Sequence, residues 1–190
     1  MLMRLYRSLL REYGTQRWWP AETQYEVVVG ALLTQNTNWR NVERAIANLK
    51  KAGALSPGKV LRMRRARLES LIRPSGFYRQ KAGRLKLLTR KYVEISRRGS
   101  PPARDELLAV KGVGKETADS ILLYAFGLPH FVIDAYTRRF CAHHKLFESR
   151  EYDDYKRFFE SSLPRSVPVY KEYRALIVEW GKDLRNRGAP

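Results

Sequence analysis

Apolar residues recur at helical spacing along almost the whole chain, and this periodicity restricts the fold more than any other feature. Stripes at positions i, i+3 or i+4 and i+7 indicate the buried faces of amphipathic helices. The clearest stripes are Val42, Ala45, Ile46 and Leu49; Leu85, Leu88, Tyr92 and Ile95; Tyr152, Tyr155, Phe158 and Phe159; and Tyr173, Leu176, Ile177, Trp180 and Leu184. Residues 27–29 and 131–133 could form strands, but two short fragments do not make a sheet. The sequence therefore predicts an all-α fold of roughly eight to ten short helices.

The charge balance indicates a polyanionic partner. Lys and Arg number 37 against 19 Asp and Glu, which gives a formal net charge of +18. Lys and Arg release condensed counterions when they bind phosphates, so this excess favours nucleic acid over an anionic membrane surface. No apolar run approaches the roughly 18 residues of a membrane span, and we expect a soluble protein. Residues 1–13 carry arginines among apolar residues at helical spacing, which predicts a first helix in preference to a targeting peptide.

Cysteine and histidine usage argues against a bound metal. Cys141 is the single cysteine, which excludes a disulfide framework and any four-cysteine zinc or iron–sulfur site within these 190 residues. His143 and His144 are adjacent, so their side chains diverge on a helix and are poorly placed to share a metal. We predict no metal site and a reducing compartment.

Residues 107–122, LLAVKGVGKETADSIL, form the most informative local motif. One amphipathic helix ends at a Gly-x-Gly turn and a second helix begins at once, with Val113 able to fill the core between them. Gly112 and Gly114 permit positive φ and close backbone approach, so successive N–H groups and a helix N-terminus can bind a phosphate oxygen. Lys111 and Lys115 would add attraction. The alternative is a plain tight turn between packed helices.

Several blocks of the sequence, in this order, resemble the endonuclease III superfamily of DNA glycosylases. Residues 110–118, VKGVGKETA, look like its helix-hairpin-helix, and residues 132–139, VIDAYTRR, look like the segment with its catalytic aspartate. The resemblance continues through residues 31–37, ALLTQNT, and 73–82, RPSGFYRQKA. With Trp18-Trp19-Pro20 included, the pattern is most similar to the endonuclease III-type 3-methyladenine DNA glycosylases.

The resemblance implies an all-α, two-lobed, endonuclease III-like fold without an iron–sulfur cluster. One helical lobe is expected over residues 21–132, including the hairpin, and the other over residues 1–20 and 133–190. Related enzymes place four cysteines after the last helix, whereas residues 181–190 contain none. Arg185 and Arg187 are candidates for replacing phosphate contacts there, or they belong to a frayed tail.

Asp134 and Glu116 are the predicted catalytic residues. Cleavage of an N-glycosidic bond builds positive charge on the sugar, which a carboxylate stabilises while it positions water, and the resemblance gives this role to Asp134. Asp134 is also a helix N-cap candidate, and the two roles are compatible. Glu116 stands where bifunctional members have the lysine that attacks the sugar, and a carboxylate cannot form a Schiff base. We therefore expect hydrolysis alone, although Lys111 and Lys115 are close in sequence. Glu116 alternatively serves the helix dipole.

An enzyme that acts on a base inside a duplex must flip it out and replace the lost stacking. Trp18, Trp19 and Trp39 are predicted walls of an aromatic base pocket, with Pro20 fixing the turn that presents the first two. A 3-methylated purine is cationic, so indole faces would prefer it by about 0.5 to 2 kcal/mol per contact. Core packing is the alternative for each tryptophan.

The remaining predicted contacts are to the DNA backbone and to the gap left by the flipped base. Gln35 or Asn36 would fill the gap, as the resemblance implies, or both are turn residues. The hairpin contacts are predicted at Lys111, Gly112, Val113, Gly114, Lys115 and Thr117. Two basic groups are less specific; of these, Arg79, Lys81, Arg84 and Lys86 are better phosphate candidates than Arg62, Arg64, Arg65 and Arg67.

The sequence predicts a monofunctional DNA glycosylase of base excision repair that releases alkylated purines such as 3-methyladenine from double-stranded DNA. We expect a cytoplasmic, nucleoid-associated monomer without a cofactor, apart from a potassium or sodium ion that the resemblance implies at the hairpin. One alternative is a glycosylase with lyase activity toward oxidised pyrimidines. The other is a DNA-binding module without catalysis.

Overall fold

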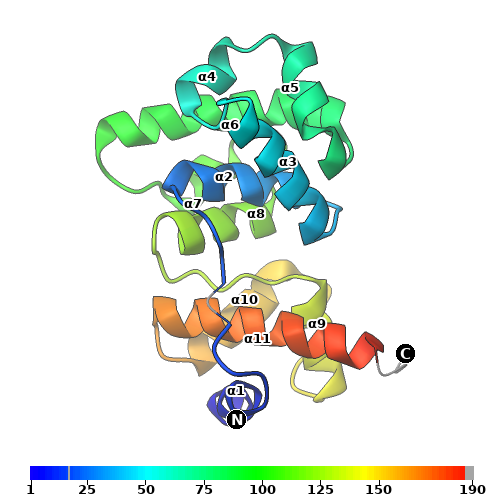
Figure 1. The fold of residues 1–190 in the computed structure, drawn as a ribbon. Coiled ribbons are helices and arrows are strands. Elements are labelled where there is room, and N and C mark those ends of the chain that lie inside the picture. Colours follow the sequence, from blue (N-terminus) through cyan, green and yellow to red (C-terminus); the bar gives the residue numbers. More distant parts are fainter. Residues whose placement is uncertain (17, 187–190) are drawn as a thin grey trace. The chain divides into compact units, whose positions relative to one another are not determined.

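The computed structural model describes residues 1–16 and 18–186, and Figure 1 shows that its elements are helices. The bounds are α1 Leu2–Tyr13, α2 Gln24–Leu33, α3 Trp39–Lys51, α4 Pro57–Arg62, α5 Arg65–Ile72, η1 Arg73–Ser75, α6 Tyr78–Arg98, α7 Arg104–Leu108, α8 Lys115–Ser120, η2 Ile121–Ala125, α9 Ala135–His143, α10 Tyr152–Ser162 and α11 Val167–Asn186. No strand occurs in the described ranges, so the all-α prediction is confirmed. Arg187 and the side chain of Arg185 lie outside what the structure describes.

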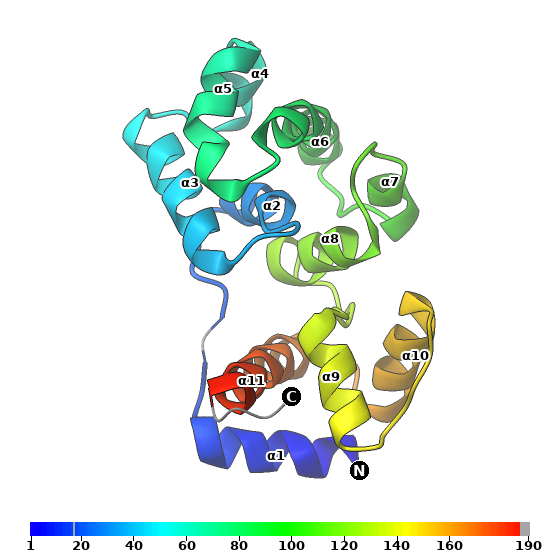
Figure 2. The same ribbon diagram turned by 90° about the vertical axis from the view of Figure 1, so that its right-hand side faces the viewer.

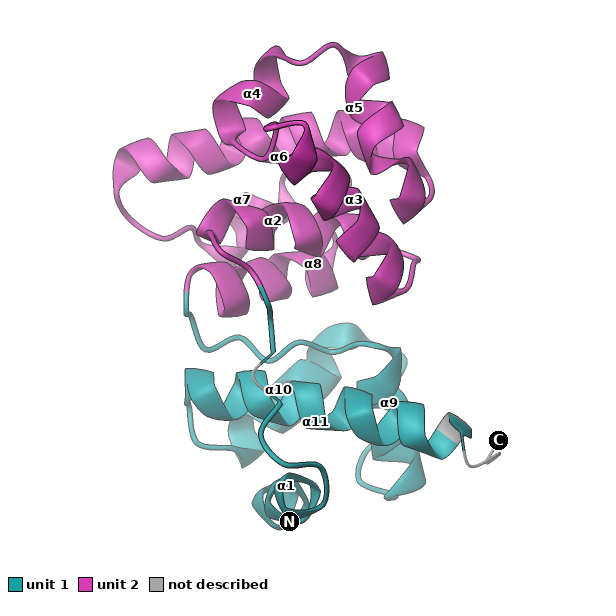
Figure 3. Cartoon of the chain, in the orientation of Figure 1, with its two compact units in different colours: residues 1–20, 127–190 teal, residues 21–126 magenta. Residues whose placement is uncertain are grey.

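The chain forms two compact units, drawn in different colours in Figure 3. Residues 1–20 and 127–190 form the terminal unit, and residues 21–126 form the central unit. Residues 127–132, which the sequence assigned to the other lobe, belong to the terminal unit. The reason is Phe131, whose ring stacks on Phe159 at a centroid distance of 4.3 Å and meets the edge of Tyr170 at 5.3 Å. Within the described ranges, no helix is both long and apolar enough to cross a membrane.

The central unit is built around α2, a mostly apolar helix that is buried on all sides from Tyr25 onward. Thr23 caps this helix by accepting a hydrogen bond from the Glu26 N–H, and residues 25–33 are all buried. A helix that is hydrophobic all round needs neighbours on every face. Accordingly, α2 packs against α3, α6 and α8, which Figure 2 labels, and against η2. This packing places the loop after α2 beside the hairpin between α7 and α8.

The terminal unit is built around α11, which packs against α1 and α9. Its buried face is aromatic: Tyr173 lies 5.3 Å from Tyr6 between ring centroids, and its hydroxyl donates to the Leu2 carbonyl at 3.1 Å. Trp180, near the other end of the helix, meets the ring of Phe140 at 5.1 Å. These contacts fix α9, and with it Asp134, against α11.

Candidate functional site

The hairpin turn between α7 and α8 needs glycine at one of its two glycine positions. Gly112 has φ of +88°, and a Cβ there would overlap the side chain of Arg84. Gly114 has φ of −90° with open space around a Cβ, so of these two glycines it is Gly112 that adopts the positive φ. Val113 is buried between the helices. The turn is thus held by the buried Val113 side chain, and its backbone requires glycine at position 112.

The outer face of the hairpin is polar and accessible. Lys111, Gly114 and Glu116 are exposed, and Lys115 is half-buried. The N–H groups of residues 115–117 occupy the first turn of α8, which is where a helix presents N–H groups to an anion. Glu116 lies in that first turn. The hairpin therefore keeps its predicted basic side chains at the surface.

Gln35 and Asn36, the two candidates for the flipped-base gap, lie in different surroundings. Gln35 Nε2 donates to the Gly112 carbonyl at 2.9 Å and to Thr117 Oγ1 at 3.0 Å, and its Oε1 accepts from Arg84 Nη1 at 3.3 Å. Asn36 is exposed and has φ of +50°. Gln35 thus links the loop after α2 to the hairpin, whereas Asn36 projects from that loop.

A partly buried ion pair joins the two helices of the hairpin, and it was not expected from the sequence. Arg104 of α7 donates from Nε to Asp119 Oδ1 at 2.8 Å and from Nη2 to Oδ2 at 3.0 Å. The Asp119 side chain is fully buried. Two parallel bonds from one guanidinium fix both distance and angle between the helices. A carboxylate next to Ala118, on the apolar face of the second helix, was the available signal.

Lys81 supports the main chain and is not a phosphate contact, contrary to the grouping inferred from sequence. Its side chain is 1% exposed, and Nζ donates to the carbonyls of Leu33 at 2.9 Å and Ser75 at 2.6 Å. Burial, reinforced by the nearby charge of Arg84, lowers the pKa of Lys81 to about 8. Lys86 is similarly engaged with the Leu61 carbonyl at 3.1 Å. These α6 lysines therefore hold the ends of shorter helices.

Asp134 caps α9 in the terminal unit, as its position in the sequence indicated. Oδ1 accepts from the Thr137 N–H at 2.8 Å and from Thr137 Oγ1 at 3.0 Å, which satisfies a first-turn donor of the helix. Oδ2 accepts from Arg174 Nη2 at 3.1 Å. The Asp134 and Arg174 side chains are 10% and 8% exposed. Sequence reasoning missed Arg174, although an arginine within the aromatic stripe of the last helix is a signal for a buried acidic partner.

The predicted pocket residues divide between the units. Trp18 and Trp19 lie together in the terminal unit, half-buried, with ring centroids 6.4 Å apart and an edge-on arrangement. Pro20 beside them is exposed. Lys182 Nζ lies 5.8 Å from the centroid of the Trp18 ring, so a cation already contacts this indole. Trp39 begins α3 in the central unit, and its Nε1 donates to Glu43 at 2.9 Å.

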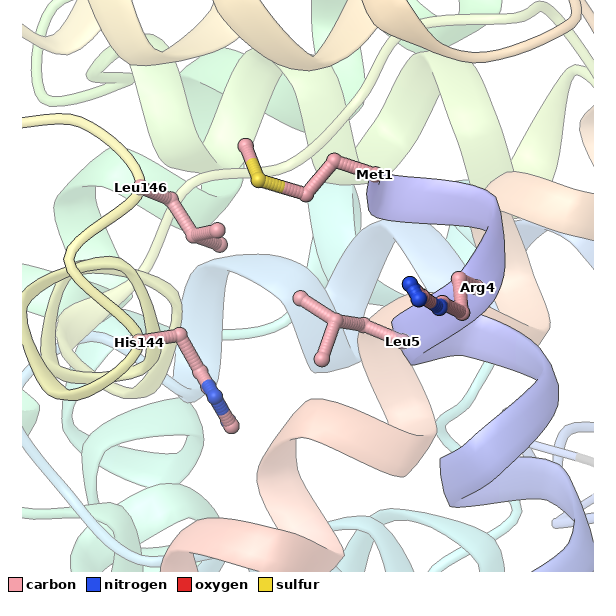
Figure 4. A pocket seen from close by; sticks show the side chains of 5 residues that line it. All are labelled: Met1, Arg4, Leu5, His144 and Leu146. Atoms are coloured by element: carbon pink, nitrogen blue, oxygen red, sulfur yellow. The ribbon is translucent and has the colours of Figure 1, made fainter.

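A separate hollow of about 490 Å³ lies in the terminal unit, between the start of α1 and the end of α9. Figure 4 shows its lining of Met1, Arg4, Leu5, His144 and Leu146. Burial and the neighbouring His143 lower the pKa of His144. The hollow contains none of the predicted site residues.

The donor set does not fit an iron–sulfur cluster. Cys141 is buried within α9, and burial raises the pKa of its thiol to about 12, which disfavours the thiolate that iron requires. Among the described residues there is no group of three or more His, Cys, Asp or Glu arranged to hold a metal ion. The hairpin carbonyls are a different case, because each carbonyl oxygen has two lone pairs and hard cations prefer oxygen ligands.

A glycine hairpin between packed helices and, later in the chain, an aspartate that caps a helix are two of the features on which the resemblance to DNA glycosylases rests. The chain belongs to the HhH-GPD superfamily of base excision DNA repair proteins, whose family model matches residues 29–165. The resemblance inferred from sequence is thereby confirmed.

Individual relatives agree with this family. A Methanocaldococcus jannaschii protein provisionally described as a DNA repair glycosylase is 52% identical over 100% of this chain and 90% of its own length. Endonuclease III of Thermotoga maritima is 27% identical over 97% of this chain and 84% of its own. The solved H. pylori 3-methyladenine DNA glycosylase MagIII, bound to 1,N6-ethenoadenine, superposes with a TM-score of 0.82 at 29% identity, covering 96% of each chain.

Proposed function

We propose that this base excision repair glycosylase is monofunctional and hydrolyses the N-glycosidic bonds of alkylated purines, such as 3-methyladenine, in double-stranded DNA. The observation that carries the proposal is Glu116, an exposed acid in the first turn of α8 at the position where lyase-competent members have lysine. The likeness to the H. pylori 3-methyladenine glycosylase, at 29% identity over 96% of each chain, supports the substrate class.

Asp134 is the proposed catalytic carboxylate. Its negative charge would stabilise the positive charge that develops on the deoxyribose, and it would position the attacking water. Hydrogen bonds from Thr137 and Arg174 already hold both of its oxygens. The group would therefore need little reorganisation when the reaction begins, which is how preorganised charges lower a barrier. Glu116, in the first turn of α8, is the second proposed catalytic residue, and its carboxylate would form no covalent intermediate.

The base pocket is proposed to include Trp18, Trp19 and Trp39, with Pro20 at its edge. Indole faces attract a cationic methylated purine by about 0.5 to 2 kcal/mol per contact. The weaker glycosidic bond of an alkylated base would supply the rest of the selectivity. Gln35 or Asn36 would fill the gap in the duplex.

We propose that the hairpin contacts the phosphates of the DNA backbone. The contacts would come from the side chains of Lys111 and Lys115 and from main-chain N–H groups near Gly112, Val113, Gly114 and Thr117. The hairpin carbonyls would hold a potassium or sodium ion against the DNA, and we propose no other cofactor. The protein would act as a monomer on nucleoid DNA in the cytoplasm. Nothing in this arrangement needs a second copy of the chain.

A glycosylase with lyase activity toward oxidised pyrimidines is the second candidate. The 27% identity to Thermotoga maritima endonuclease III over 97% of this chain favours it. In that case an exposed lysine of the hairpin, such as Lys111, would have to replace the missing nucleophile.

The two candidates are separated by assaying base release and strand cleavage on the same duplexes, one set methylated and the other carrying an oxidised pyrimidine. We expect free 3-methyladenine without nicking, and Asp134→Asn should reduce release to a small but measurable residual rate while leaving affinity for an abasic-site analogue intact. Nicking at the oxidised pyrimidine would overturn the proposal, and release from neither duplex would indicate a binding module.

The tryptophan pocket is tested by the ratio of two rates. Trp18→Ala should slow release of 3-methyladenine more than release of a neutral base measured in parallel, because stacking serves both bases but the cation–π contact serves only one. Equal losses would leave Trp18 as a stacking or packing residue.

A further inference from the structure

The two carboxylate oxygens of Asp134 are held by different elements of the terminal unit. Oδ1 is bound within α9 itself, by the backbone and the hydroxyl of Thr137. Oδ2 is bound by Arg174, which comes from α11. The Arg174 residue is buried, with 6% of its surface exposed. One carboxylate is therefore fixed by two helices at once.

The contact with Arg174 has two effects on Asp134: it compensates the buried negative charge, and it restricts rotation of the carboxylate. A nearly buried carboxylate is unfavourable unless a cation or several donors compensate its charge, and Arg174 is the buried cation that faces it. The terminal torsion of an aspartate is also soft, so a cap bond to one oxygen alone permits rotation of the group. A second bond, at 3.1 Å to the other oxygen, removes that freedom.

We propose that Arg174 is a positioning residue that holds the Asp134 carboxylate in a single orientation for base release and acts on the reaction through Asp134 alone. The proposal rests on the catalytic role proposed for Asp134. In this scheme Arg174 makes no contact with substrate; its Nη2 binds Asp134, and its side chain is 8% exposed. A direct phosphate contact by Arg174 is the opposing interpretation, and it predicts a loss of DNA affinity.

The test is a double-mutant cycle on the full chain. Single-turnover base release from methylated DNA is measured for Arg174→Gln in the wild-type and in the Asp134→Asn background, with affinity for an abasic-site duplex measured alongside. We expect Arg174→Gln to slow release about 10- to 100-fold, because a catalytic group misplaced by about 1 Å loses about that much, while affinity stays within about twofold. In the Asp134→Asn background the same change should cause no further loss.

Further variants keep the outcome decisive. Arg174→Lys retains the buried cation and should recover part of the rate. If circular dichroism shows that Arg174→Gln does not fold, Arg174→Lys replaces it in the double-mutant cycle. Lys171→Gln alters the charge of the same helix and is the matched control, expected to keep the wild-type rate.

Three results would overturn the proposal. Equal fractional losses in both backgrounds would mean that Arg174 acts by general stabilisation, and a parallel fall in affinity would mean that it contacts DNA. A wild-type rate for Arg174→Gln would mean that the cap bonds from Thr137 orient Asp134 without it. A wild-type rate for Asp134→Asn is a distinct result, because it removes the catalytic assignment itself.

Discussion

Arg174 in the terminal unit and Lys81 in the central unit are both buried cations, but they face different kinds of acceptor. Arg174 faces the carboxylate of Asp134, so a full negative charge compensates its burial. Lys81 faces the carbonyls of Leu33 and Ser75, and carbonyl dipoles compensate a buried charge less well. The pKa of Lys81 is accordingly lowered to about 8, whereas arginine keeps its charge in proteins. The terminal unit uses its buried cation to hold a reactive side chain, and the central unit uses its own to hold helix ends.

The largest expected effect is on the free energy of unfolding, which should fall more when Arg174 is replaced than when Lys81 is replaced. Arg174→Met leaves the Asp134 carboxylate buried without its cation, which costs about 3 to 5 kcal/mol in the free energy of unfolding. Lys81→Met leaves two carbonyls without their donor, which costs about 1 to 3 kcal/mol. Urea denaturation measures both. Adding Asp134→Asn to Arg174→Met should restore much of the loss, and a larger cost for Lys81→Met than for Arg174→Met would break the comparison.

A smaller effect is expected in the pH dependence of stability. The pKa of Lys81 is about 8 in the folded chain against an ordinary value of 10.5, so between these values the unfolded chain binds more protons. The Lys81 contribution to the free energy of unfolding therefore rises with pH across this window, and its burial penalty is largest below pH 8. Unfolding at pH 7.5 and 9.5 would be compared between the wild type and Lys81→Met. If the difference in free energy of unfolding between the two proteins stays constant or shrinks toward pH 9.5, Lys81 is not a buried ammonium whose charge is only partly compensated.

The smallest effect concerns an exposed cation of the hairpin. Lys111→Gln should leave the free energy of unfolding within about 0.5 kcal/mol of the wild type, because the side chain is exposed. It should reduce the slope of log affinity for DNA against log salt by about 1, the contribution of one phosphate contact. Titrations at several salt concentrations measure the slope. An unchanged slope together with lower stability would erase the distinction between exposed cations that bind DNA and buried cations that support the fold.

The sequence predicted those features that depend on nearby residues. The stripe of α3, Val42 to Leu49, is buried as its period indicates, and Asp134 caps α9 as its place before a helix indicates. The hairpin was also visible locally, from its glycines. The Arg174 contact joins residues 40 positions apart, and the Lys81 contact to Leu33 spans 48, so both depend on how helices pack. A basic residue on an apolar stripe shows that a buried acceptor exists, but only the packing shows which acceptor it is.

The contact between Arg84 and Gly112 has a consequence for how such a chain can change over evolutionary time. The Arg84 side chain fills the space where a Cβ at position 112 would lie, and the same guanidinium bonds to Gln35. Shortening the side chain at position 84 would clear that space, but φ of +88° would still strain any other residue at position 112. The same shortening would remove the donor to the side-chain oxygen of Gln35. We therefore expect glycine to persist at position 112 whatever residue occupies position 84, and positions 84 and 35 to change together.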